Sequence, residues 1–273
     1  KTDTPLLETP QAISVISREQ MDARGVTTLE EALRYTPSIS VPYGFDTRYD
    51  WFSIRGFDAK TRVFRDGLVQ PTSTYGLPRL DSWAMERIEV LRGPASVLYG
   101  EGATGAVINV VPKKPFAGEI RNQLRLGYGS DDRRQAALDS GGSLSDSLSY
   151  RFNVNQQASN GWVDRGDSDS IALSAALRWA ASDDLSFTLS HDHGDQRPER
   201  YFGTPLVDGH YRESIRERNY NFANADIRYN YQVTRLTTDW HINDALTASN
   251  QLYYIKTQRY WRNAEAYRWQ PGD

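Results

Sequence analysis

The chain has 273 residues, with 32 Lys and Arg against 35 Asp and Glu, which gives a formal net charge of −3. This balance, without a long basic run, excludes a dedicated nucleic-acid binder, and a hydrophobic content of 38% argues against wholesale disorder. The absence of cysteine excludes disulfide and thiol chemistry.

The first 115 residues mix helix and strand patterns. Capping boxes at 17–20 and 27–30 open two short helices, which end at Gly25 and before Pro37. The Asp66-Gly67 pair predicts a tight hairpin. The expected strands are 12–16, 51–54, 62–65, 88–91 and 106–111. These elements predict a compact α+β unit of about a hundred residues.

A domain boundary is expected in the segment VPKKPF at 111–116, where two prolines flank a basic pair. Beyond it the helix patterns vanish, so we assign one domain to 1–115 and a second to 116–273.

The second domain reads as a series of antiparallel strands. Three similar polar turns, LSDSLS, ASDDLS and INDALT, begin at residues 144, 181 and 242. Apolar and polar residues alternate around them, as expected for strands with one apolar face. The seven expected strands are 119–128, 133–142, 148–158, 170–180, 185–194, 227–242 and 246–258.

Aromatic residues favour a membrane-spanning barrel over a soluble sheet. Tyr150 and Phe187 lie four residues after a turn aspartate, and Trp179 and Trp240 lie four residues before one, all on the leucine-bearing face. An aromatic row beside short turns is typical of the periplasmic rim of an outer-membrane barrel. The longest apolar run is only four residues, 252–255, but barrel strands need only alternate apolar residues. A soluble β-sandwich with Trp in its core stays open as an alternative.

Loop lengths have the same asymmetry as a barrel. The segments 159–168 and 195–224 are longer and richer in Gly, Asn, Asp, Arg and Tyr than the turns at the other ends of the strands. Short turns at one end and long loops at the other are typical of outer-membrane barrels.

Two motifs are also found in other classes of protein, those that bind dinucleotides and those that bind metal ions. Gly100 to Gly105 matches G-x-G-x-x-G, but a short helix is expected before it and a strand after it, the reverse of the dinucleotide-binding arrangement. His191 and His193 share one strand face, yet no third ligand lies nearby in sequence, so a polar strand end is favoured over a metal site. No catalytic constellation can be assembled from spacing, and we expect no enzyme activity and no metal site.

Six ordered motifs resemble the plug domain of TonB-dependent ferric-siderophore receptors. They are TPQAISVIS at 9–17, LEEALRYTP at 29–37, IRGF at 54–57, RDG at 65–67, ERIEVLRGPASVLYG at 86–100 and GAVINVV at 105–111. The resemblance runs from about residue 3 to residue 115. The remainder is similar to the opening strands of that family's barrel, which has 22 strands closed around the plug.

The resemblance implies an outer-membrane receptor of a Gram-negative cell that binds a ferric siderophore and imports it. The plug would be gated by the TonB-ExbB-ExbD complex, which draws on the proton-motive force and grips a segment upstream of Lys1. Iron would enter only within the chelate, without a resident cofactor, and the other partner would be outer-membrane lipid. The siderophore type stays open among hydroxamate, catecholate, citrate and mixed chelates. A TonB-dependent receptor for haem or cobalamin is the alternative, and a passive porin is disfavoured because it lacks a plug.

The resemblance also implies ligand contacts and plug–barrel contacts. In the plug loops and the long barrel loop, the expected ligand-binding residues are Tyr43, Phe45, Arg48, Tyr49, Lys60, Gln70, Tyr75, Tyr201 and Phe202. Thr204 stands where hydroxamate receptors have Trp. Arg55 and Arg92, each beside a glycine of a plug motif, are expected to pair with barrel carboxylates and hold the plug in place.

Chain length sets a further expectation. With the plug ending near Pro115, 273 − 115 leaves 158 residues for about seven strands, or roughly 22 per strand. A barrel of 22 strands would need on the order of 500 residues at this spacing. We therefore expect a whole plug joined to about a third of a barrel, ending inside an extracellular loop.

Overall fold

The computed structural model describes residues 12–40, 50, 52–58, 63–70, 78–92 and 106–264. The chain forms two compact units, and it passes from one to the other between Lys113 and Lys114. Across these ranges, no helix combines the length and the apolar composition that crossing a membrane requires.

The first unit is an α+β domain with two small sheets. One sheet has the strand order β1-β7-β8-β5-β6 and the other β2-β3-β4. The elements are β1 (Ala12–Ser17), α1 (Arg18–Ala23), α2 (Leu29–Leu33), β2 (Ile39–Ser40), β3 (Ser53–Ile54), β4 (Phe57–Asp58), β5 (Val63–Arg65), β6 (Leu68–Val69), β7 (Met85–Arg92) and β8 (Ala106–Pro112). Met21 of α1 and Leu33 of α2 are fully buried in one core with Ile88 of β7 and Ile108 of β8.

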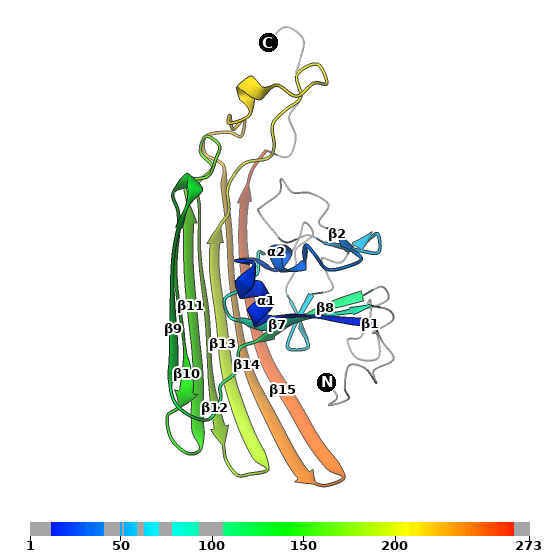
Figure 1. Cartoon of the computed structure of the whole chain (residues 1–273), viewed down its shortest axis with the longest axis vertical. Helices are drawn as coiled ribbons and strands as arrows, with labels where there is room; N and C mark the ends of the chain where they lie inside the picture. The colour runs from blue at the N-terminus through cyan, green and yellow to red at the C-terminus, as the bar shows by residue number, and fades with distance from the viewer. Residues whose placement is uncertain are drawn as a thin grey trace. The chain divides into compact units, whose positions relative to one another are not determined.

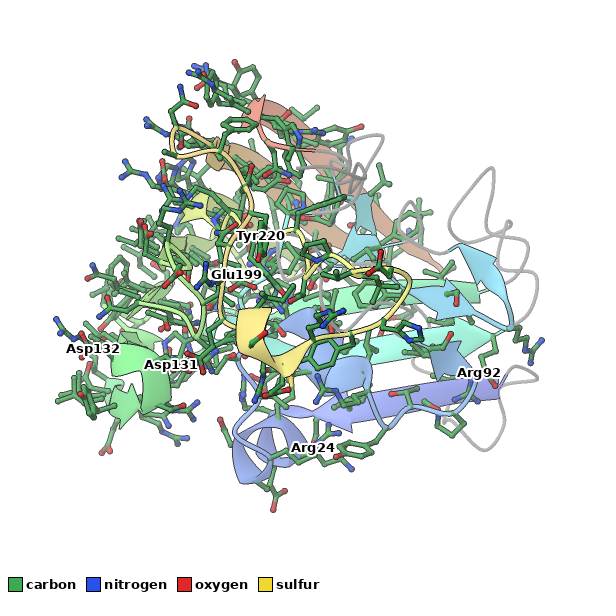
Figure 2. The ribbon with its side chains drawn as sticks, turned by 90° about the horizontal axis from the view of Figure 1, so that it is seen from above. Arg24, Arg92, Asp131, Asp132, Glu199 and Tyr220 are labelled. Carbon is green, nitrogen blue, oxygen red and sulfur yellow. The ribbon has the colours of Figure 1, made fainter. Side chains whose placement is uncertain are left out.

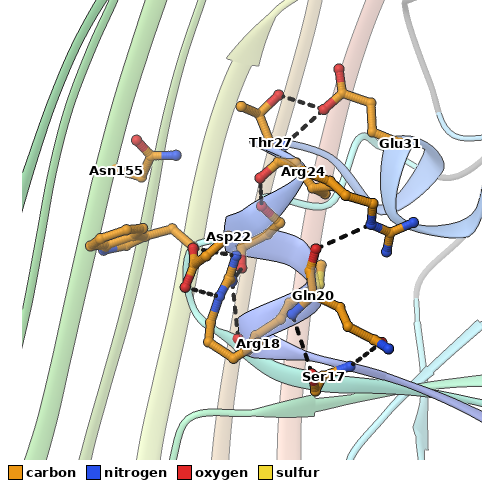
Figure 3. A network of polar contacts seen from close by, with 12 residues as sticks. Ser17, Arg18, Gln20, Asp22, Arg24, Thr27, Glu31 and Asn155 are labelled. Carbon is orange, nitrogen blue, oxygen red and sulfur yellow. Dashed lines mark hydrogen bonds and ion pairs between the residues drawn. The ribbon is translucent and has the colours of Figure 1, made fainter.

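Both predicted helices are present, and the second begins one residue later than expected (Figure 3). Ser17 and Gln20 form the predicted capping box of α1. The box of α2 is made by Thr28 and Glu31. The Glu31 carboxylate also accepts hydrogen bonds from the backbone N–H of Thr27, at 2.7 Å, and from its hydroxyl, at 2.9 Å. Because Thr27 is held as a donor outside the helix, Thr28 becomes the N-cap.

Strands near the predicted 12–16, 62–65, 88–91 and 106–111 are all confirmed. Of the predicted 51–54, only Ser53–Ile54 forms a strand, and Trp51 lies outside the described residues. The hairpin at Asp66-Gly67 is also confirmed, because Arg65 pairs with Leu68 across it. Its turn residues have positive φ angles of 49° and 82°, which Asp tolerates and Gly adopts without strain. The helix and glycine motif expected at 94–105 lie outside the described ranges.

The second unit is a single antiparallel meander of seven strands (Figure 1). The strands are β9 (Arg121–Gly129), β10 (Arg133–Ser143), β11 (Leu148–Ser159), β12 (Ser168–Ala180), β13 (Leu185–Arg197), β14 (Asp226–Asn243) and β15 (Leu246–Arg262). All seven predicted strands are confirmed. Each pairs with its neighbours in chain order, and the described sheet is open, with β9 and β15 at its two edges. Tight turns join the strands at one end, and the long loop with the 3-10 helix η3 (Glu213–Ile215) lies at the other.

The predicted aromatic row lies on one face of this sheet. Trp179 and Phe187 are directly opposite each other across β12 and β13, with ring centroids 5.7 Å apart in a stacked arrangement. Trp179 is 52% exposed and Trp240 is 48% exposed. A sandwich core would bury both indoles, so the exposed aromatic row contradicts the β-sandwich alternative and agrees with a lipid-facing surface.

The opposite face is polar and carries a charged pair near the start of the unit. The Arg151 guanidinium donates two hydrogen bonds to the Asp139 carboxylate, at 2.7 and 2.6 Å. It also lies 5.3 Å from the ring centroid of Phe116. A Cβ on Gly141 would lie 2.6 Å from Arg151 Cδ and 2.8 Å from the Phe116 ring, so a side chain at this position would displace one of the two. Arg151 thereby joins the first residues of the second unit to its strands.

Candidate functional site

Six of the nine predicted ligand-binding residues lie outside the described ranges, and their contacts stay predictions. They are Tyr43, Phe45, Arg48, Tyr49, Lys60 and Tyr75. The structure describes the other three, Gln70 in the first unit and Tyr201 and Phe202 in the second.

Gln70 follows β6 and is turned toward its own hairpin. The residue is only 4% exposed. Its side-chain Nε2 donates to the carbonyl oxygen of Leu68 at 3.3 Å, and its backbone N–H donates to the carbonyl oxygen of Val63 at 2.9 Å. Gln70 therefore stabilises the β5–β6 hairpin, and a ligand contact by its side chain stays a prediction.

Tyr201 is enclosed by side chains of two loops at the loop end of the second unit. It is 6% exposed, and its ring meets the Trp162 ring edge-on, with 5.4 Å between the centroids. Its hydroxyl shares a 2.6 Å hydrogen bond with the Thr204 hydroxyl. The Arg216 guanidinium lies 5.7 Å from the centroid of the Trp162 ring. Sequence reasoning did not identify Trp162, because it lies in a different loop, between β11 and β12.

Phe202 lies beside this cluster and is partly buried. The chain turns at the following residue, Gly203, whose φ of +96° is rarely adopted by residues with a side chain. This turn returns Thr204 to the Tyr201 hydroxyl. The segment 201–204 is therefore a compact turn that encloses Tyr201 and leaves Phe202 more accessible.

The loop end of the second unit is shown in Figure 2, where Glu199 and Tyr220 mark the long loop 198–225 and Asp131 and Asp132 mark the turn between β9 and β10. The loop 198–225 contains four Arg and four acidic residues, so its formal net charge is zero with His210 neutral. Several of these charges are paired. The ion pairs are Arg200 with Asp167, Arg212 with Asp208 at 4.0 Å, and Arg216 with Glu213 at 3.3 Å.

Local pairing also affects the acidity of this loop. The Tyr211 hydroxyl donates a 2.9 Å hydrogen bond to the Glu213 carboxylate, and this bond, together with a second from Arg216, lowers the pKa of Glu213. A carboxylate held in its charged form continues to balance the neighbouring guanidinium. The pairs Arg212–Asp208 and Arg216–Glu213 lie within the loop, whereas Arg200 pairs with Asp167 of the neighbouring loop.

Arg55 and Arg92 occupy contrasting positions in the first unit. Arg55 is exposed in the tight turn between β3 and β4, with a φ of 53°. Arg92 ends β7, and its guanidinium donates to the Ser14 hydroxyl on the neighbouring strand β1. The Nε atom of Arg92 is buried and has no hydrogen-bond partner among the described residues. Their pairing with barrel carboxylates stays a prediction.

A buried acidic cluster in the first unit was not identified from the sequence. Asp50 is fully buried, and its Oδ2 accepts a 2.8 Å hydrogen bond from the Leu80 N–H. Burial raises the pKa of Asp50 to about 7, and nearby Arg79 opposes this shift only in part. Arg79 also lies 3.6 Å from the Glu30 carboxylate, whose pKa is likewise raised by burial. The sequence alone gives no signal that an aspartate beside predicted loop residues is buried.

The two neighbouring histidines, His191 and His193, lie on one face of β13. The His191 ring shares a 2.9 Å hydrogen bond with the Thr234 hydroxyl on β14. His193 lies on the same face of β13, opposite Leu173 and Gln232. Over the described part of the chain, no three or more His, Asp or Glu side chains are grouped to hold a metal ion.

Comparisons with known proteins identify relatives of the first unit and of the whole chain. Residues 5–107 match the family described as the TonB-dependent Receptor Plug Domain. The chain is 34% identical over 195 residues to the ferrioxamine receptor of Yersinia enterocolitica, a match that covers 69% of this chain and 27% of that protein. It is 29% identical over 272 residues to the ferrichrome outer membrane transporter/phage receptor of Escherichia coli K12, covering 94% of this chain and 36% of that protein.

Solved structures share the fold over nearly the whole chain. The pyoverdine outer membrane receptor FpvA from Pseudomonas aeruginosa PAO1 matches with a TM-score of 0.83 and 24% identity, covering 93% of this chain and 38% of that one. The siderophore receptor PiuA from Acinetobacter baumannii matches with a TM-score of 0.80 and 22% identity, covering 94% of this chain and 38% of that one. The chain thus spans roughly a third of the length of these proteins.

Proposed function

We propose, since the chain belongs to the TonB-dependent siderophore receptors, that it forms the plug and first strands of an outer-membrane receptor that binds and imports a ferric siderophore. The supporting observation is the joining of a plug-type α+β unit to an antiparallel sheet with an exposed aromatic row on one face. Its relatives are receptors and transporters, so the chain is not part of an enzyme.

In this proposal, a separate protein complex supplies the energy for import. The TonB-ExbB-ExbD complex pulls on a segment upstream of Lys1, and the proton-motive force supplies the energy. The aromatic side chains of the sheet contact outer-membrane lipid of a Gram-negative cell. Iron enters as part of the cargo, and the protein needs no cofactor of its own.

Ligand recognition combines aromatic surfaces with a few hydrogen-bond donors. A large polar chelate requires both contact area and directed donors, which aromatic, amide and guanidinium groups supply. The predicted contacts are of these types. The zero net charge of loop 198–225 favours a chelate of low net charge, such as ferrichrome or ferrioxamine B, over a ferric catecholate carrying several negative charges.

Fluorescence titration of the purified full-length receptor in detergent tests the ligand. Ferrichrome, ferrioxamine B, a ferric catecholate and ferric citrate are each added to the receptor, and quenching of tryptophan fluorescence is followed to saturation. We expect saturable quenching by ferrichrome or ferrioxamine B, with none from haem or cobalamin as control cargoes. Quenching by haem or cobalamin alone, or by none of these compounds, would contradict the proposal.

Arg55 and Arg92 hold the plug against the barrel wall in this proposal. The buried Nε of Arg92 has no hydrogen-bond partner among the described residues, which supports a further acceptor there, whereas the exposed Arg55 enters the proposal through the resemblance alone. Replacing both residues with Met should raise the leak conductance of the receptor in planar bilayers without abolishing ligand binding. Unchanged conductance would count against this role.

A further inference from the structure

Three segments that are distant in sequence meet at Asn221. They are the loop 160–167 between β11 and β12, the loop 198–225 between β13 and β14, and residues 263–264 after β15. Asn221 is only 4% exposed, although it lies in a loop. We call Arg165, Arg200, Asn219, Asn221 and Asn263 the loop junction.

The side-chain amide of Asn221 donates two hydrogen bonds and accepts two. Its Nδ2 donates to the carbonyl oxygen of Arg200 at 2.6 Å and to the Asn263 side-chain oxygen. Its Oδ1 accepts from the backbone N–H of Phe222 at 3.0 Å and of Ala264 at 3.1 Å. Two backbone donors on one side and a backbone carbonyl on the other determine which way the amide points. No other residue type of this size supplies two donors and a double acceptor from one side chain.

Arg165 joins the loop 160–167 to the same junction. One of its guanidinium nitrogens, Nη2, donates to the carbonyl oxygens of Asn219 at 2.5 Å and Asn221 at 2.8 Å. The backbone of Arg165 has a φ of 54°, which residues with a side chain rarely adopt. Next to Arg165, a backbone hydrogen bond from the Asp164 N–H to the carbonyl oxygen of Glu217, at 2.8 Å, also joins the two loops.

The junction acts directly on the segment that carries two predicted ligand contacts. Asn221 holds the carbonyl oxygen of Arg200, and Arg200 immediately precedes Tyr201. Arg200 also pairs with Asp167 of the neighbouring loop. The turn 201–204 is therefore held at two points: at the backbone, through the Arg200 carbonyl that precedes it, and at a side chain, through the Tyr201 ring that contacts Trp162.

We propose that Asn221 is a positioning residue for ligand binding, which holds the turn 201–204 in its binding conformation before the ligand arrives. The inference rests on the proposed siderophore-binding function. A preorganised loop loses less conformational freedom when the ligand binds, so the loop junction raises affinity without touching the ligand.

The substitution Asn221→Asp tests the role with little change in shape. Asp keeps the acceptor for the Phe222 and Ala264 N–H groups but loses both donors, and it faces the Arg200 carbonyl with an oxygen. We expect faster hydrogen exchange in peptides covering 199–204 and about tenfold weaker binding, the order expected for losing buried hydrogen bonds. Asn224→Asp is the matched control, because Asn224 is exposed in the same loop and undergoes the same chemical change.

The measurements are hydrogen exchange and fluorescence titration with ferrichrome and ferrioxamine B, both on the full-length receptor in detergent. Heat-modifiable migration on electrophoresis verifies that each barrel is folded. If Asn221→Asp does not fold, Asn263→Ala is measured in its place with the same outcomes expected; it removes the acceptor for Asn221 Nδ2 and the bond from Asn263 Nδ2 to the Ala264 carbonyl oxygen.

The outcomes separate the positioning role from the alternatives. Faster exchange at 199–204 together with weaker binding supports it. Weaker binding with unchanged exchange would make Asn221 a direct ligand contact, and faster exchange with unchanged affinity would show that the loop junction does not serve binding; either result overturns the proposal. If the wild-type receptor binds none of the four ferric chelates, the proposed function fails independently of the Asn variants. Exchange at 199–204 that is the same in both Asn variants would then overturn the loop junction as well.

Discussion

The buried carboxyl of Asp50 makes the stability of the plug depend on pH. Asp50 is fully buried, its Oδ2 accepts a 2.8 Å hydrogen bond from the Leu80 N–H, and its Oδ1 has no hydrogen-bond partner in the described part of the chain. The charged groups that act on it are Arg79, which favours the carboxylate, and Glu30, which disfavours it. Replacing Asp50 with Asn keeps the shape and the acceptor for Leu80 but removes the titration.

The direction and size of the effect follow from the pKa of Asp50. Burial raises this pKa from 3.8 to about 7, so the folded plug binds the proton more tightly than the unfolded chain does. The resulting stabilisation is complete below pH 3.8 and is lost as the pH rises to about 7. The full shift corresponds to about 4 kcal/mol at 1.36 kcal/mol per pH unit, and roughly 3 kcal/mol of it is lost between pH 5 and pH 8.

Hydrogen exchange of the plug segment 78–85 in the full-length receptor measures this loss. Opening of the segment releases the Leu80 N–H from Asp50 and exposes the carboxyl, so protection corrected for the intrinsic exchange rate should fall by about a hundredfold from pH 5 to pH 8. Asp50→Asn should abolish this pH dependence. Glu19→Gln, which removes an exposed carboxylate of α1, is the control and should retain it. Equal pH dependence in wild type and Asp50→Asn would refute the reasoning.

Two further predictions concern the strands. Asp139→Asn removes one charge of the part-buried pair with Arg151 and should lower the unfolding free energy by about 2 kcal/mol, measured by urea unfolding in lipid vesicles. Asp132→Asn is the control, because Asp132 belongs to a more exposed ion pair with Arg134 and its loss should have a much smaller effect. Similar losses of unfolding free energy in the two variants would contradict the argument. Gly194→Ala should destabilise the sheet by about 1–3 kcal/mol, because the new Cβ would lie 2.2 Å from the Tyr231 ring. An unfolding midpoint equal to wild type would show that this ring moves freely.

Much of the fold was accessible from local sequence patterns. Alternation with a period of two and repeated polar turns are local properties, and they predicted all seven strands β9 to β15. The turn-based spacing also predicted the exposed face of Trp179 and Trp240, since strand residues two apart share a face. The second helix was misplaced by one residue because two consecutive threonines offer equivalent caps, and the choice depends on which N–H groups the Glu31 carboxylate reaches.

The candidate site was less accessible, because its key contacts join residues far apart in the chain. The resemblance at Tyr201 implied a ligand contact, which stays a prediction, whereas the enclosure of Tyr201 by Trp162 depends on how two loops pack. Asn221 and Asp50 carry no sequence pattern that separates them from exposed loop residues. Period, turn chemistry and motif order in the sequence therefore determined the strands, the plug unit and the family. The tertiary structure alone decided which polar groups are buried and what they bond, because burial and partners arise from contacts that no local pattern records.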